Sequence, residues 1–151
     1  MTKIDLLSPG EDTLERILDW RDRTAIGGWL AFDAAVKDGR HFYTLRRAEH
    51  HVGNEMTRSL HGGVISSFLQ ACAVNEIRSR LDPGSTARAI SVHCNYLRPA
   101  ADEDMFAHVD IIRHGRRISF VEATSWQADQ DKPIGRAAVA LRIMPTPTDD
   151  A

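Results

Sequence analysis

The feature that most constrains this chain is one long helical segment with almost no polar face. It extends from about Gly62 to Leu81, and its central part, from Val64 to Val74, is apolar on nearly every side. Such a helix must be wrapped by other structure, because a surface helix needs a polar stripe toward water. Asp82-Pro83-Gly84 ends the helix. The chain therefore requires a sheet large enough to enclose this helix.

The segments around this helix supply that sheet. A turn dipeptide, Asp38-Gly39, separates two β-prone runs and predicts a hairpin before the helix. A short amphipathic helix with Leu14, Ile17 and Leu18 on one stripe comes first, and we expect Gly27-Gly28 to end it. The expected strands are Trp29–Lys37, His41–Arg47, Arg88–Leu97, Met105–Arg113, Arg117–Ala128 and Ile134–Met144.

This order of elements favours an α+β protein of hotdog architecture, in which an antiparallel sheet is wrapped around one long central helix. In that architecture the sheets of two subunits usually join edge to edge, which also covers exposed edge strands. We expect residues 1–144 to form a single domain. We expect residues 145–151 to form a flexible tail, because the alternating prolines Pro145 and Pro147 disfavour helix and sheet alike.

Composition excludes several classes of function. The 151 residues include 42% hydrophobic ones, enough for one globular core, and the formal charge of −2 is spread over the whole length. We therefore expect no nucleic-acid partner. An apolar signal segment and a run of transmembrane length are both missing, so we expect a cytoplasmic protein with no membrane partner. Cys72 and Cys94 lie in apolar or β-like surroundings and are expected to be core thiols, not a disulfide.

Three short motifs carry a resemblance to a known family. His61-Gly62-Gly63 stands where a loop meets the long helix, Asn95-Tyr96-Leu97-Arg98-Pro99-Ala100 ends the next strand, and Gly115-Arg116 precedes a later one. In this order and on these elements, the motifs resemble those of PaaI-like hotdog thioesterases, the phenylacetyl-CoA and 4-hydroxybenzoyl-CoA type. The resemblance covers roughly residues 26–143. It implies hydrolysis of a small or medium acyl-CoA, aromatic ones included, at the interface of a homodimer or homotetramer, with coenzyme A as part of the substrate and no separate cofactor.

The glycine-rich start of the helix can bind an oxygen atom, whether or not the resemblance holds. Glycines there let a ligand approach the backbone, and amides of the first turn have no partner inside the helix, so they can donate to an oxygen that gains negative charge. By resemblance, the Gly62 amide polarises the thioester carbonyl, with Gly63 beside it. The alternative interpretation is that the two glycines only allow the helix to pack tightly against the sheet. His61 is a further candidate for the site, although in related proteins this histidine mostly shapes the loop.

The resemblance breaks at the catalytic carboxylate. Relatives place Asp or Glu eight residues after the first glycine, where this chain has Gln70, and an amide can neither attack nor take up a proton usefully. Six residues before the histidine, where relatives have an amide, stands Glu55, with Asn54 next to it. One hypothesis is an exchange, in which Glu55 of one subunit acts as base or nucleophile opposite Gln70 of the other. The other is that Glu55 and Arg58 form an exposed pair on a loop and that Gln70 is a core amide.

Other candidates concern substrate binding. Ser67, in the first turns of the helix, can hydrogen-bond a substrate or simply pack. Arg113, Arg116 and Arg117 lie on a predicted hairpin where relatives hold the phosphates of coenzyme A, a task that suits guanidinium groups; a solvated turn is the ordinary alternative. The histidines lack the spacing of a zinc site, so we expect no metal. We expect His50 and His51 to point to opposite faces of a strand.

Three functions remain open at this point. The first is an acyl-CoA thioesterase that uses Gly62, Glu55 and Gln70. The second is an acyl-CoA-binding protein with weak or no catalysis because of Gln70. The third, a hotdog dehydratase or hydratase, ranks last because the helix lacks the acid that such enzymes place there.

Overall fold

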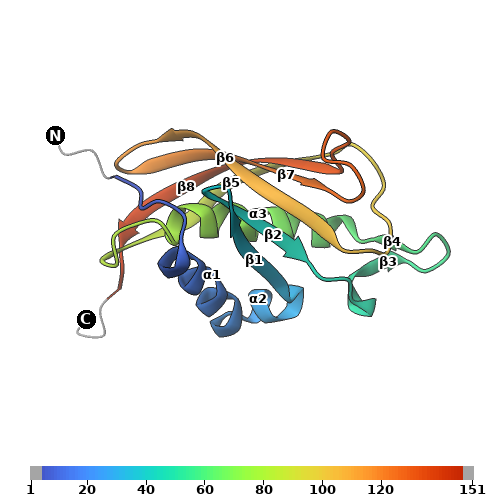
Figure 1. Ribbon diagram of the computed structural model, residues 1–151. Coiled ribbons are helices and arrows are strands. Elements are labelled where there is room, and N and C mark those ends of the chain that lie inside the picture. The colour runs from blue at the N-terminus through green and yellow to red at the C-terminus, as the bar shows by residue number, and fades with distance from the viewer. Residues whose placement is uncertain (1–4, 148–151) are drawn as a thin grey trace.

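A six-stranded antiparallel sheet curves around one long helix in the computed structural model, which describes residues 5–147 (Figure 1). The strand order is β1-β2-β6-β7-β8-β5, and the enclosed helix is α3 (Gly62–Arg78). The strands are β1 (Phe32–Lys37), β2 (Arg40–Leu45), β5 (Ser85–Tyr96), β6 (Met105–His114), β7 (Ile118–Trp126) and β8 (Gly135–Pro145). The predicted hotdog arrangement is therefore confirmed.

Helix α3 forms the centre of the core, as its apolar sequence requires. Val64, Ile65, Phe68, Leu69 and Cys72 are all buried, and the helix packs against β5, β7 and β8. The helix is three residues shorter than expected, ending at Arg78 before Leu81. The strand boundaries differ from the predicted ones by up to three residues.

The first hairpin is confirmed in its position and its turn chemistry. Asp38 and Gly39 connect β1 and β2 with φ values of 52° and 73°. Two positive φ values are the geometry that a two-residue hairpin turn needs, and Asp-Gly is a favoured pair for it.

The prediction that Gly27-Gly28 ends the first helix is wrong. Helix α1 (Glu11–Arg23) ends at Arg23 with Thr24 as its C-cap, and a second short helix, α2 (Ala25–Leu30), contains both glycines. The Thr24 hydroxyl accepts a hydrogen bond from the Gly27 amide and caps α2. A Cβ at Gly27 would lie 2.5 Å from the Arg21 carbonyl oxygen, so this glycine permits the close contact between α1 and α2.

The segment between β2 and α3 has structure that the sequence did not predict. A 3-10 turn (Glu49–His51) leads into a small hairpin of β3 (Val52–Asn54) and β4 (Ser59–Leu60). This hairpin projects beyond the N-terminal end of α3 in Figure 1. The prediction that His50 and His51 lie on opposite faces of a strand is wrong, because in the 3-10 turn their ring centroids are only 4.4 Å apart.

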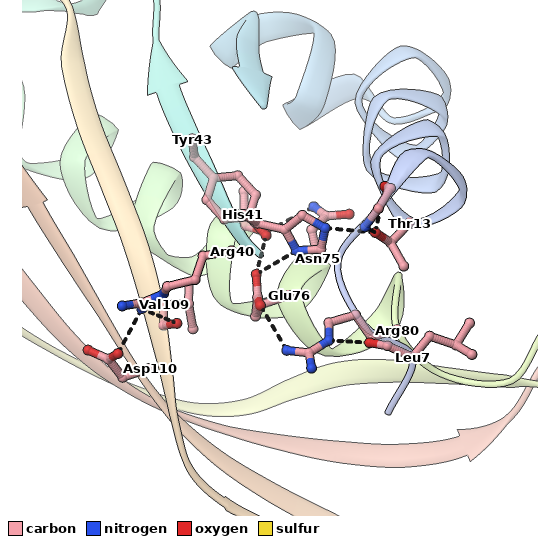
Figure 2. Close-up of polar contacts among 12 residues, drawn as sticks. Leu7, Thr13, Arg40, His41, Tyr43, Asn75, Glu76, Arg80, Val109 and Asp110 are labelled. Carbon is pink, nitrogen blue, oxygen red and sulfur yellow. Dashed lines mark hydrogen bonds and ion pairs between the residues drawn. The ribbon is translucent and has the colours of Figure 1, made fainter. Parts of the chain in front are cut away.

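A buried polar cluster ties α1, β2 and α3 together (Figure 2). Glu76 on α3 accepts a hydrogen bond from the Tyr43 hydroxyl at 2.8 Å and lies 3.0 Å from His41 Nδ1. The other ring nitrogen of His41 lies 2.8 Å from the Thr13 hydroxyl of α1, and Arg80 pairs with Glu76 at 3.1 Å. Burial and the neighbouring Glu76 carboxylate raise the pKa of Tyr43 well above its usual value. Each buried polar group here is satisfied by another, as a buried cluster requires.

Further expectations concern the thiols and the chain end. Both cysteines are free, as predicted, with Cys72 buried and Cys94 half-buried.

At the end of the chain, strand β8 extends to Pro145, and the Thr146 amide donates a hydrogen bond to the Gly84 carbonyl. Residues 148–151 of the expected tail lie outside the described residues. Over residues 5–147, no helix is both long enough and apolar enough to cross a membrane.

Candidate active site

The N-terminal tip of α3 presents one amide that no other group uses. His61 caps the helix, because its Nδ1 accepts a hydrogen bond from the Gly63 amide at 2.8 Å. Within residues 5–147, nothing accepts a hydrogen bond from the Gly62 amide. The Tyr96 hydroxyl donates to the Gly62 carbonyl oxygen at 2.8 Å and so holds the tip against the end of β5. The positive end of the helix dipole and a free amide together favour an oxygen with negative charge.

The β3–β4 hairpin lies directly against this tip. A Cβ at Gly53 would come within 2.7 Å of His61 Cα and 2.8 Å of His61 Cβ, so only glycine allows this approach. The Asn54 side-chain oxygen accepts hydrogen bonds from the Met56 and Thr57 amides and shapes the turn that follows. Nothing in the sequence pattern had marked Gly53, although an isolated glycine in a strand is a known signal of close backbone approach.

Glu55 occupies the exposed turn of this hairpin. Its carboxylate makes no hydrogen bond or ion pair with any residue of the described range. A carboxylate without a partner remains available to a substrate or to a neighbouring subunit. The end of the molecule that carries the Gly62 amide therefore also carries an uncommitted carboxylate.

The hypothesis of an exposed Glu55–Arg58 pair is wrong, because Arg58 binds other carboxylates. Its guanidinium binds both carboxylate oxygens of Glu49, at 2.8 and 2.9 Å, and it also binds Asp102 at 2.6 Å. Hydrogen bonds from Arg58 and Arg47 lower the carboxyl pKa of both Glu49 and Asp102 to about 2. We call these four residues the arginine clamp; it fixes the base of the hairpin while Arg58 adopts a positive φ of 55°.

Gln70 lies on the exposed side of α3, so it is not a core amide. It lines a hollow with Ser67, which also lines a second hollow at the helix tip. Eight residues separate Gly62 from Gln70, about 12 Å along a helix that rises 1.5 Å per residue. One protomer therefore cannot bring both groups to a single thioester, although each is accessible.

The predicted arginines lie at the other end of the sheet. Tyr96, next to Gly62, pairs with Gly135 at one end of β8, whereas Arg117 accepts a hydrogen bond from Ile143 near the opposite end. Arg113 and Arg116 share the same β6–β7 hairpin, which lies far from the β3–β4 hairpin in Figure 1. Within one protomer, these side chains are not gathered at the helix tip.

A cysteine thiol, a histidine or a bound metal ion would be an alternative way to carry out the chemistry. Burial, together with the nearby Glu76, raises the pKa of the Cys72 thiol well above its usual value, which disfavours a thiolate nucleophile. Burial also lowers the pKa of His51. Across residues 5–147, no three histidine, cysteine or acidic side chains are grouped so that they could hold a metal ion.

Comparison with known structures agrees with this fold. A thioesterase from Haemophilus influenzae matches with a TM-score of 0.81 at 18% identity, over 97% of this chain and all of that one. The PaaI protein of the Escherichia coli phenylacetic acid degradation operon matches with a TM-score of 0.75 at 18% identity, over 91% of this chain and 97% of that one. A Bacillus halodurans protein solved with CoA gives 0.73 at 18% identity, over 92% and 97% of the two chains.

A sheet wrapped around one long helix, as in these solved structures, identifies the hotdog fold. The profile of one family, described as the acyl-CoA thioesterase N-terminal domain, matches residues 50–143, more than half of the chain. The chain belongs to this family and is an acyl-CoA thioester hydrolase. A search of curated proteins found no match.

Proposed function

We propose that this enzyme hydrolyses a small or medium acyl-CoA in a composite site built by two copies of the chain. One copy supplies the Gly62 amide and Glu55, and the other supplies Gln70. The observation that carries this proposal is that a free helix-tip amide and an uncommitted carboxylate lie at the same end of the molecule. Gln70, about 12 Å away on the same helix, then serves the site of the neighbouring copy.

Two surfaces support a homodimer. Strand β5 pairs only with β8 among the described strands, and it exposes large apolar side chains, including Ile90 and Val92. Met56, at the turn of the β3–β4 hairpin, is 94% exposed. Pairing of two β5 edges about a two-fold axis removes an open sheet edge and places the two α3 helices in opposite directions. Such an arrangement brings the tip of one helix toward the middle of the other; a tetramer of two such dimers is compatible with it.

The proposed reaction follows from these groups. Glu55 takes a proton from water, and the oxygen of that water bonds to the thioester carbon. The carbonyl oxygen becomes an oxyanion that accepts the Gly62 hydrogen bond, while the Gln70 amide orients the carbonyl or the water. When the tetrahedral intermediate collapses, the carbon–sulfur bond breaks and coenzyme A leaves as a thiolate that takes up the proton. Glu55 acting directly as a nucleophile is the alternative route to the same products.

Binding of the coenzyme A part is assigned to two regions. The hollow at the helix tip, about 430 Å³ and lined by residues such as Trp29, His50 and Gly63, suits the pantetheine arm. Arg113, Arg116 and Arg117 of the partner are proposed to meet the phosphates, because reversed helices bring that end of the partner toward the tip. We also propose that the reaction needs no cofactor and that the enzyme works in the cytoplasm.

The test is a thiol-reagent assay of free coenzyme A over a panel of acyl-CoAs, combined with sedimentation to measure the oligomer. We expect Glu55→Gln to reduce kcat at least a hundredfold while the protein stays folded and dimeric. Glu15→Gln is the matched control, because Glu15 is an exposed residue of α1 whose carboxylate, like that of Glu55, has no hydrogen bond or ion pair within residues 5–147. Full activity of Glu55→Gln, or a fully active monomer, would overturn the composite site.

A further inference from the structure

A small hollow lies on the exposed side of α3, next to the hollow at the helix tip. It encloses about 120 Å³. Its lining residues are Trp20, Ile26, Ser67, Gln70, Ala71 and Val74. Because Ser67 lines both hollows, the two are neighbours along one helix. A substrate held at Gln70 therefore has this small hollow directly beside its reacting group.

The walls of the small hollow are apolar. Trp20, Ile26, Ala71 and Val74 supply hydrocarbon and an indole ring, and the only polar side chains are those of Gln70 and Ser67. Ile26 is 43% exposed, although a large aliphatic side chain gains free energy when a ligand covers it. Such a lining suits a hydrocarbon better than the amides of pantetheine or the phosphates, because Gln70 and Ser67 offer few hydrogen-bond partners and no positive charge.

The outer wall of this hollow is rigid near the turn between α1 and α2. Trp20 belongs to α1 and Ile26 to α2, and Thr24 between them joins the two helices. The Thr24 hydroxyl donates to the Trp20 carbonyl at 2.9 Å and accepts from the Gly27 amide at 3.1 Å. The Trp20 ring also packs against Phe32 with centroids 6.2 Å apart. The position of Ile26 relative to Trp20 is therefore set by the fold.

The opposite end of α1 is attached to α3 itself. Thr13 reaches Glu76 through His41 in the buried cluster of Figure 2. Arg16 donates to the Ser79 carbonyl just after α3, at 3.1 Å. Since α3 carries Gln70 and α1 leads into the outer wall, these contacts fix the width of the hollow.

We propose that Trp20, Ile26 and Val74 form a subsite for the end of the acyl chain, and that the two N-terminal helices thereby set its length. At about 30 Å³ for each water-sized group, the hollow holds roughly four such groups. The ligand class is therefore an acyl-CoA with a medium-length aliphatic chain, whose last roughly four carbons occupy the hollow. Acetyl-CoA leaves the hollow empty, and palmitoyl-CoA exceeds it. This inference rests on the proposed composite site, because Gln70 is its link to the thioester.

The test compares chain-length profiles of variants in the outer wall. Ile26→Trp fills the hollow, and we expect the ratio of kcat/KM for octanoyl-CoA to that for acetyl-CoA to fall about tenfold or more, as for a lost apolar contact. Ile26→Ala enlarges the hollow and moves the optimum toward longer chains. Ile112→Trp, at a 67% exposed position on β6, is the matched control and keeps the wild-type profile.

A binding measurement separates this inference from the mechanism. Thioether analogues of coenzyme A that carry octyl or ethyl groups cannot be hydrolysed, so calorimetry reports their affinity whether or not the protein turns over. A loss of octyl preference in Ile26→Trp supports the subsite even if Glu55 proves dispensable. A chain-length preference that is the same in wild type, Ile26→Trp and Ile26→Ala overturns it and places the acyl end elsewhere.

Discussion

Replacing Gly62 by proline tests the oxyanion role by removing one hydrogen atom that the site needs. Gly62 is the first residue of α3, where proline is favoured, and its amide takes no part in the helix. The preceding residue, His61, has φ −65° and ψ 134°, which is the extended conformation that a following proline demands. The substitution should therefore preserve the fold, and the lower freedom of the unfolded chain favours stability slightly.

We expect Gly62→Pro to lower the rate of catalysis without lowering the stability of the fold. Loss of one oxyanion donor typically lowers kcat by roughly 10²- to 10³-fold, about 3 to 4 kcal/mol of transition-state stabilisation. Gly62→Ala is the control, because it keeps the amide and its Cβ would lie 3.4 Å from the Tyr96 ring, an ordinary contact. The assay is free coenzyme A release at saturating substrate, with circular dichroism and analogue binding to verify the fold. If Gly62→Pro is folded and binds the analogue yet turns over as fast as Gly62→Ala, the oxyanion assignment is wrong.

Three further predictions concern the parts that hold the tip in place. Gly53→Ala should displace the β3–β4 hairpin and strongly lower kcat, because the new Cβ would lie 2.7 Å from His61 Cα. Gly28→Ala is the control and should keep full activity, because its Cβ would meet nothing within 4 Å. His61→Ala should lower the free energy of unfolding by about 1 kcal/mol through loss of the cap, measured by urea titration, whereas His61→Asn should restore most of it; equal losses would argue against capping. The arginine clamp should weaken in acid: the carboxyl pKa of Glu49 is depressed from 4.5 to about 2, so its stabilising effect is present above pH 4.5 and is lost as the pH falls toward 2. The difference in thermal midpoint between wild type and Arg58→Gln should shrink over that range, and a constant difference would contradict the ion-pair explanation.

Local patterns in the sequence were enough for the architecture. The apolar run from Val64 to Val74 requires an enclosing sheet, and Asp38-Gly39 defines a hairpin, because side-chain periodicity and turn chemistry act between near neighbours. The same is true of the helix tip, where His61-Gly62-Gly63 indicated a backbone amide free to donate a hydrogen bond; that His61 caps the helix was seen only in the structure. The glycines of α2 misled the prediction because Gly27 serves packing against Arg21, a contact that its neighbours in sequence do not reveal.

The placement of catalytic and binding groups depended on contacts between distant parts of the chain. Only the fold shows that Arg58 binds Asp102, 44 residues away, and so leaves Glu55 without an ion-pair partner in the described protomer. Likewise, only packing of α1 and α2 on α3 brings Ile26 to Gln70, through ties such as Thr13 to His41, 28 residues apart. The sequence alone therefore determined an enclosed helix with a glycine tip, since those features follow from local propensity. The hairpin that carries the carboxylate and the apolar hollow were decided by tertiary structure, because ion pairs and shape complementarity form only after distant segments meet.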